Sequence, residues 1–270
     1  MGEQTAISWC DHTFNMWWGC WKIADECKFC YADSTAARYA PGHWGREAPR
    51  RFFGDDHWKQ PIKWNAKALR DGVRRRVFVG SMMDWAEQHP DPEINRQMDA
   101  YRGRLWKLID ECRGLDWLLL TKRIDDVDPL LPWTVKPWPH VWIGVTAGTR
   151  ESLAKVITLR TITAAVRFVS CEPLLEHITA TDWDSALGSL VDYFGEDMDV
   201  PAVNWLIVGN ESGPKRRPAQ LDWVRTAREA AARHAVAFHF KQWVEANGKK
   251  THLPVLDGRQ HAAFPEVARG

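Results

Sequence analysis

The chain of 270 residues is 45% hydrophobic and 26% charged, which is typical of a folded globular protein and excludes a disordered, collagenous or coiled-coil chain. Its longest apolar runs, 117–120 and 205–208, are far shorter than the ~20 residues that cross a bilayer, and its first residues lack a signal-peptide pattern. We therefore expect a cytoplasmic protein with no membrane contact. Since 36 Lys and Arg residues balance 35 Asp and Glu residues, we also expect no overall attraction to nucleic acid.

The predicted elements alternate along the chain between strands and helices. A first strand is expected near 6–9 or 13–16, and a cysteine-rich loop and a helix over about 32–39 follow it. From residue 77 onward, short apolar runs that are typical of buried strands alternate with helical stretches. The strands are expected at 77–80, 117–120, 141–145, 166–169, 205–208 and 236–240, and the helices at about 61–73, 91–112, 150–160 and 220–234.

This alternation indicates a right-handed parallel α/β fold. No linker or internal repeat interrupts the chain, so residues 1–270 are predicted to form a single domain. Because no Gly-x-Gly-x-x-Gly turn follows the first strand, we expect a complete or partial TIM-type (β/α) barrel rather than an open dinucleotide-binding sheet.

Polar residues follow the apolar run of each predicted strand. In a barrel the carboxyl ends of the strands meet at one face, and active sites lie there. A single strand has to end in something polar where it meets solvent, but six such ends in succession indicate the rim of an active site. These polar groups include Asp84, Lys122, Glu172, Glu211 and Lys241.

Three of the six cysteines lie within eleven residues. They are Cys20, Cys27 and Cys30. In a cytosolic protein this crowding indicates metal or redox chemistry rather than disulfides. A structural zinc ion needs four ligands, and Cys10, His12 or His43 could supply the fourth. A [4Fe–4S] cluster with three thiolate ligands and one open iron fits better, so we predict an N-terminal iron–sulfur cluster loop.

The segment 27–32, Cys-Lys-Phe-Cys-Tyr-Ala, resembles the second half of the cluster loop of radical S-adenosylmethionine (SAM) enzymes. In those enzymes Cys-x3-Cys-x2-Cys is usual, whereas six residues separate the first two cysteines here. Over nearly its whole length the chain also resembles a family of phage and bacterial three-cysteine proteins that is grouped with radical-SAM-like barrels. The motifs that carry this wider resemblance lie at 7–9, 13–15, 19–20, 78–84, 120–123, 142–146, 170–175, 205–213, 240–243 and 256–259.

The resemblance implies an iron–sulfur enzyme that cleaves SAM and abstracts hydrogen from a substrate, with electrons from an external donor. SAM would bind through its amino and carboxylate groups to the open iron of the cluster, and the protein would bind the rest of SAM. The residues expected to contact SAM are Phe29 and Tyr31 beside the adenine, Ser81 and Asp84 near the amino group, and Thr146 and Glu172 near the ribose or carboxylate.

A set of charged residues near the predicted barrel mouth indicates the class of substrate. Cations that converge beside loop tryptophans suit a phosphate-bearing ligand, so a nucleotide or nucleic-acid substrate, for modification or repair, is expected. The predicted substrate-binding residues are Lys122, Arg123, Glu211, Arg216, Arg217 and Lys241.

Two other interpretations of the same residues stay open. In the first, zinc or a cluster only braces the N-terminal loop of a nucleic-acid-binding protein. In the second, the chain is a redox protein without SAM chemistry. Iron in the purified protein would favour the enzyme and the redox interpretations over zinc.

Overall fold

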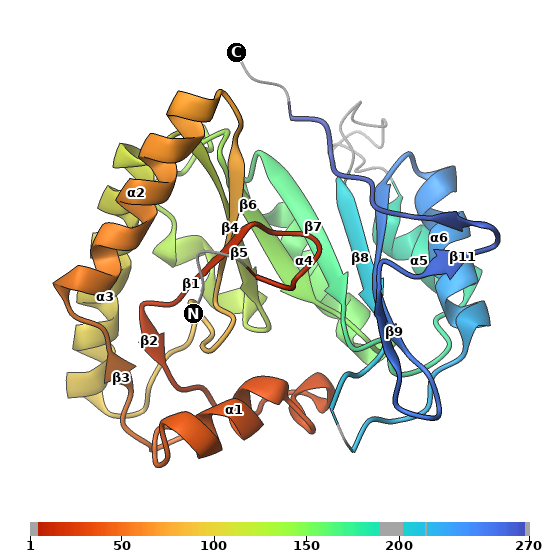
Figure 1. Ribbon diagram of the computed structural model, residues 1–270, viewed down its shortest axis with the longest axis horizontal. Helices are drawn as coiled ribbons and strands as arrows, with labels where there is room; N and C mark the ends of the chain where they lie inside the picture. The colour runs from red at the N-terminus through yellow and green to blue at the C-terminus, as the bar shows by residue number, and fades with distance from the viewer. Residues whose placement is uncertain (1–4, 189–201, 214, 268–270) are drawn as a thin grey trace.

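The computed structural model describes residues 5–188, 202–213 and 215–267, and one eight-stranded sheet forms its centre (Figure 1). The strand order is β1-β4-β5-β6-β7-β8-β9-β10. Neighbouring strands from β1 to β9 are parallel, and β10 is antiparallel to β9. The predicted α/β class with parallel strands is therefore confirmed. The sheet is curled but open, because β1 and β10 form its two edges, so the described strands do not close a complete barrel.

The strands follow the apolar runs of the sequence. They are β1 His12–Phe14, β4 Arg75–Val79, β5 Leu115–Thr121, β6 Val141–Thr146, β7 Val166–Cys171, β8 Trp205–Gly209, β9 Ala237–Val244 and β10 Lys250–His252. Each of the six runs predicted after residue 77 contributes to one of the strands β4 to β9. Of the two positions considered for the first strand, 13–16 is the one that overlaps β1. The single-domain prediction spans 1–270, of which 1–4, 189–201, 214 and 268–270 lie outside the described residues.

The helices that flank the sheet on its convex side are α2 Asp55–Asp71, α3 Pro92–Glu111, α4 Ala154–Thr161, α5 Ala180–Leu187 and α6 Leu221–Arg233 (Figure 1). The remaining described helix, α1 Tyr31–Tyr39, lies apart from them. Helix α3 begins as predicted, because the Asp91 carboxylate accepts the N–H groups of Glu93 (2.8 Å) and Ile94 (3.4 Å). Helix α5 was missed, although Thr179 and Asp182 form a reciprocal capping box at its start.

Side chains along the strands alternate between the two faces of the sheet. Residues such as Val77, Val79 and Ile143 join the main core with the helices. The opposite, concave face carries a second cluster that we call the aromatic plug. Its aromatic members are Trp9, Phe78, Trp142, Phe168 and Trp205. Their rings lie close together, at 4.7 Å between the centroids of Trp9 and Phe78 and 5.9 Å between those of Trp142 and Trp205.

Short elements complete the fold around the cysteine loop and the C-terminus. They are the 3-10 turns η1 Asp25–Cys27, η2 Ile124–Asp126, η3 Asp128–Leu130 and η4 Glu151–Leu153, and the strand pairs β2 Trp17–Trp18 with β3 Arg51–Phe52 and β11 Val255–Leu256 with β12 Arg259–Gln260. Helix α1 lies across the edge of the sheet at which the parallel strands end (Figure 1). Within the described ranges, no helix combines the length and the apolar character needed to span a membrane.

Candidate functional site

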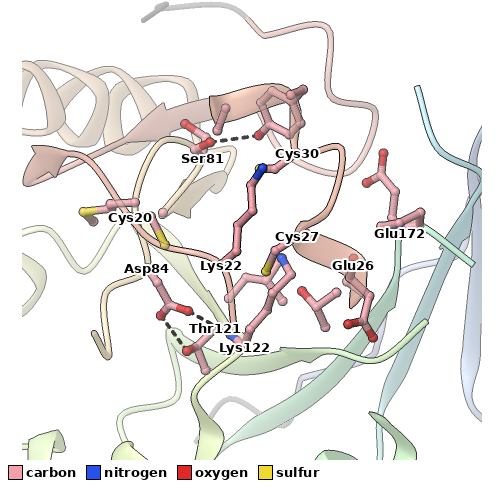
Figure 2. Close-up of a pocket in the computed structure, with 18 of the residues that line it drawn as sticks. Cys20, Lys22, Glu26, Cys27, Cys30, Ser81, Asp84, Thr121, Lys122 and Glu172 are labelled. Atoms are coloured by element: carbon pink, nitrogen blue, oxygen red, sulfur yellow. Dashed lines mark hydrogen bonds between the residues drawn. The ribbon is translucent and has the colours of Figure 1, made fainter. Parts of the chain in front are cut away.

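A pocket lies at the carboxyl ends of the parallel strands, beneath the cysteine loop. Figure 2 shows Cys20, Cys27 and Cys30 around this one pocket, although no two of them belong to the same helix or strand. All three are free thiols. The predicted gathering of polar strand ends is also observed, because Ser81, Thr121, Thr146, Ser170, Glu172 and Glu211 line the same pocket.

Cys20 is fixed by the backbone around it. Gly19 has φ +124°, a conformation that favours glycine, and a Cβ there would lie 2.3 Å from the His43 carbonyl oxygen. The Gly19 N–H donates to Met82 O (3.2 Å), and the Cys20 carbonyl accepts the Gly45 N–H (2.9 Å). Burial raises the pKa of the Cys20 thiol to about 12, so a metal that binds this sulfur has to displace its proton.

The Cys20 side chain also contacts Arg123, which follows β5. The Arg123 guanidinium donates to the Cys20 sulfur (3.6 Å), to the Asp84 carboxylate (2.9 Å) and to the Trp21 carbonyl (3.0 Å). Asp84 accepts three further hydrogen bonds, from the Thr121 hydroxyl (2.6 Å) and from the backbone N–H groups of Lys122 and Ala86. Burial opposes the charge on Arg123, but Asp84, Cys20 and Glu87 together outweigh this effect and raise the Arg123 pKa, so the side chain stays charged.

Cys27 ends the turn η1, and its neighbour Glu26 anchors that turn to the sheet. Glu26 is only 4% exposed and accepts the Gly148 N–H (2.9 Å) in the loop after β6. Burial opposes the charge on Glu26, but the hydrogen bonds from Gly148 and Ser152 outweigh it and lower the Glu26 pKa. The loops after β6 and β7 approach so closely at Gly148 that a side chain would not fit, because a Cβ there would lie 1.8 Å from the Pro173 carbonyl oxygen.

A second anchor of the same turn comes from the loop after β8. Arg217 binds the buried Glu211 carboxylate through two nitrogens (2.7 and 3.1 Å). The Arg217 guanidinium also donates to the Asp25 carbonyl (2.9 Å) and pairs with the Asp25 carboxylate (3.2 Å). It lies over the Phe29 ring as well, 5.4 Å from the centroid. Arg217 therefore links the end of β8 to the cysteine loop.

Cys30 precedes α1 and lies on the outer side of the pocket. It is half-buried, and its carbonyl accepts the Ser34 N–H (3.4 Å) in the first turn of the helix. The next residue, Tyr31, donates its hydroxyl to the Ser81 carbonyl (3.0 Å), which ties α1 to the end of β4. Ser81 in turn contacts Asn15 through its hydroxyl (2.9 Å).

The structure brings most of the residues predicted from the sequence into this pocket. Those that line it are Cys20, Cys27, Cys30, Phe29, Tyr31, Ser81, Asp84, Thr146, Glu172, Lys122, Arg123, Glu211 and Lys241. Arg216 and Arg217 are outside the described lining. Arg216 donates instead to the carbonyls of Glu245 (3.0 Å) and Ala246 (2.9 Å).

The predicted cations of the pocket differ in how they are paired. Lys241 forms an ion pair with Glu172. Burial opposes the charge on Lys122, but the sulfurs of Cys27 and Cys30 and the Asp84 carboxylate outweigh it and raise the Lys122 pKa. Lys122 is thus the cation that faces the cysteines, and Figure 2 shows it beside Cys27.

Several lining residues were missed by sequence reasoning. Glu26 is the clearest, because the sequence shows only an acid before a cysteine and does not show that it is buried against Gly148. Trp21, Trp44 and Pro173 also line the pocket. For the two tryptophans, the one sequence signal is the abundance of tryptophan in the chain, with 17 among 270 residues.

The residues considered as a fourth zinc ligand lie elsewhere. Cys10 and His12 line a different hollow, where His12 stacks on Trp64 at 4.3 Å between ring centroids. The His43 ring bonds the Pro49 carbonyl (3.0 Å). Among the described residues, no group of three or more His, Cys, Asp or Glu side chains is arranged to hold a single metal ion.

The model of the family described as Protein of unknown function (DUF5131) matches residues 4–265, and the chain belongs to this family. No curated protein and no solved structure gives a significant match to the chain. The resemblance to a three-cysteine family of unknown reaction is thus confirmed only at the level of a family whose function is unknown.

Proposed function

We propose that this member of the DUF5131 family is a radical-SAM-type enzyme with a partial TIM-type barrel, in which Cys20, Cys27 and Cys30 bind a [4Fe–4S] cluster. The observation that carries the proposal is the convergence of three free thiols on one pocket at the carboxyl ends of the parallel strands. Ligand sites of α/β barrels lie at this end, and the same pocket contains the polar residues expected to bind SAM.

The donor set suits a cluster better than a single ion. In a four-iron cluster each thiolate binds a different iron atom, so the thiolates are spread around the cluster rather than gathered on one point. Cys20, Cys27 and Cys30 all line the one pocket (Figure 2), and this set of three thiols supports the proposed cluster. Lys122 and Arg123 add positive charge beside them, which offsets the negative charge of thiolate ligands.

SAM is the proposed second ligand of the pocket. When bound, the cluster supplies one electron from an external donor to SAM, and SAM cleavage provides the group that abstracts hydrogen from the substrate. Phe29 and Tyr31 offer aromatic faces for adenine, and Thr146 and Glu172 offer oxygens for the ribose or the methionyl end. Asp84 is expected to orient Arg123 rather than to bind the SAM amino group, because its two oxygens already accept hydrogen bonds from Thr121, Lys122, Arg123 and Ala86.

The proposed substrate is a nucleotide or nucleic acid. Lys122 lines the pocket and supplies charge for a phosphate, whereas Lys241 lines it as a pair with Glu172. The aromatic rings of Trp21 and Trp44 line the same pocket. Arg216 and Arg217 are engaged with other parts of the chain, so they contribute less than the sequence predicts.

The test is anaerobic reconstitution of the full chain with iron and sulfide, followed by measurement of iron, sulfide and the optical spectrum. Cys20→Ala, Cys27→Ala and Cys30→Ala should each lose most of the iron, because three thiolates are the fewest that hold such a cluster with one iron open. Cys112→Ala is the matched control, since Cys112 is buried in the main core away from the pocket.

SAM use is tested on the loaded wild-type protein. Reduction with dithionite in the presence of SAM should release 5′-deoxyadenosine and methionine at a low uncoupled rate. A colourless protein that takes up zinc instead of iron would contradict the cluster. A loaded protein that neither binds nor cleaves SAM would restrict the proposal to a redox role.

A further inference from the structure

Arg123 is the charged side chain in direct contact with a proposed cluster ligand. Its guanidinium lies 3.6 Å from the Cys20 sulfur and is oriented to donate a hydrogen bond to it. The ring of Trp21 lies against the same guanidinium, 4.9 Å from centroid to Cζ. The sequence predicts Arg123 as a substrate-binding residue, but these contacts belong to the cysteine loop.

The guanidinium is poorly placed to bind a substrate. The residue is only 7% exposed, and the nitrogens Nη1 and Nη2 already donate to Cys20, Asp84 and the Trp21 carbonyl. Its carboxylate partner, Asp84, is 5% exposed and is held by Thr121 and by two backbone N–H groups. Asp84 is held by its three other hydrogen-bond donors, and Arg123 is held by Asp84 and by the Trp21 carbonyl. The guanidinium therefore has one orientation, in which Nη1 points at the Cys20 sulfur.

We propose that Arg123, oriented by Asp84, is a positioning residue that fixes Cys20 and raises the reduction potential of the cluster by hydrogen bonding to its sulfur. This inference rests on the proposed function, because it requires a cluster on Cys20. It adds a determinant of the redox chemistry within this chain.

The physical reason is the charge that the cluster gains on reduction. One electron from the reductant makes the cluster more negative, and a nearby cation that donates to a ligand sulfur stabilises this reduced state more than the oxidised state. Because Arg123 and Asp84 are both buried, solvent screens this interaction weakly. Loss of the donor should therefore make reduction harder.

The experiment compares loaded full-length variants by a redox titration that is followed by the optical or paramagnetic signal of the cluster. Arg123→Gln removes the charge, and Arg123→Lys retains it but cannot reach Cys20, Asp84 and Trp21 together. Lys22→Gln is the matched control. Lys22 lines the same pocket and carries the same charge, but its half-exposed ammonium group pairs with Asp33 (2.9 Å) and donates to the Lys28 carbonyl (3.2 Å) rather than to a cysteine sulfur.

We expect the midpoint potential of Arg123→Gln to shift to more negative values, that of Arg123→Lys to shift less, and that of Lys22→Gln to stay at the wild-type value. A wild-type potential in loaded Arg123→Gln, or an equal shift in Lys22→Gln, would overturn the inference. If both Arg123 variants lose iron while circular dichroism and melting temperature stay unchanged, the positioning of Cys20 is supported. If both lose the fold, Arg123 is a structural residue and the inference fails. Failure of the wild-type protein to bind iron would instead contradict the proposed function itself.

Discussion

The concave side of the sheet has two regions along the same strands, the aromatic plug and the pocket that contains the cysteines. Further from the carboxyl ends of the strands, inward positions carry the aromatic plug, as at Phe78, Trp142 and Phe168. Two or four residues further along the same strands, inward positions carry Gly80, Thr146 and Ser170, which line the pocket. Since side chains alternate with a period of two, one register of each strand supplies both the floor and the walls of the site.

The two regions are also held together by different forces. The plug consists of aromatic rings with almost no exposed surface, so its contribution is close packing and burial of apolar area. The pocket is held by charged side chains that link strand ends to the cysteine loop. Arg123 bonds Asp84 and the Trp21 carbonyl, Glu26 bonds the Gly148 N–H, and Arg217 bonds Glu211 and the Asp25 carbonyl. Many of the polar side chains at the strand ends therefore position the cysteine loop, and fewer of them have groups free to bind a ligand.

The largest expected effect lies in the plug. Trp205 is fully buried, contacts the rings of Trp9, Trp142 and Phe168, and donates its indole N–H to the Ala263 carbonyl (2.9 Å). Trp205→Ala should lower the free energy of unfolding by about 3–5 kcal/mol, as measured by denaturant titration. Trp205→Phe keeps a ring in place and should cost less. A loss below about 1 kcal/mol in Trp205→Ala would show that the plug is not a packed core.

An intermediate effect is expected where the loop meets the sheet. In Gly148→Ala the new methyl group would meet the Pro173 carbonyl at 1.8 Å, so one of the two loops has to move and the Glu26 hydrogen bond is strained. We expect a loss of about 1–3 kcal/mol in the free energy of unfolding, together with reduced iron uptake.

Gly103→Ala is the control for this substitution. Gly103 lies in α3, and a Cβ there meets nothing within 4 Å, so this change should stabilise the protein by roughly 0.5–1 kcal/mol and leave iron uptake unchanged. Equal iron uptake by Gly148→Ala and the wild-type protein would show that the contact between Glu26 and Gly148 does not position Cys27.

The contrast between apolar strand segments and contacts of charged side chains also separates what the sequence predicts from what it does not. The apolar runs at 117–120 and 141–145 are local signals, so they identify β5 and β6, and the residues after the runs identify the lining of the pocket. The pairing of charges is a long-range property. Glu26 meets Gly148 across 122 residues, and Arg217 meets Asp25 across 192, and neither distance leaves a local pattern. For this reason the sequence predicts Arg123 and Arg217 as substrate-binding residues, whereas in the structure both contact the cysteine loop.

The smallest expected effect is on Arg217, which links the loop after β8 to the cysteine loop, and it is compared with the effect on its neighbour Arg216. Arg217 has a side chain that is 21% exposed and binds a Glu211 carboxylate that is 5% exposed, so this pair is intermediate between a surface and a buried ion pair. Arg217→Gln should therefore lower the free energy of unfolding by about 1 kcal/mol and reduce iron uptake slightly, because Asp25 next to Glu26 and Cys27 loses its link to β8.

Arg216→Gln is the matched control for this pair of neighbours. It removes the same charge one residue away, but among the described residues the Arg216 side chain donates only to the backbone carbonyls of Glu245 and Ala246 in the β9–β10 turn. Its effect on the free energy of unfolding should stay within about 0.5 kcal/mol, with iron uptake as in the wild-type protein. Denaturant titration, iron content and oligonucleotide binding measured on both variants decide between two roles for these arginines. If both variants retain iron and both weaken oligonucleotide binding equally, the two arginines bind substrate, as the sequence suggests. If only Arg217→Gln lowers the free energy of unfolding and the iron content, Arg217 anchors the cysteine loop to the end of β8, as Arg123 and Gly148 do at the ends of β5 and β6.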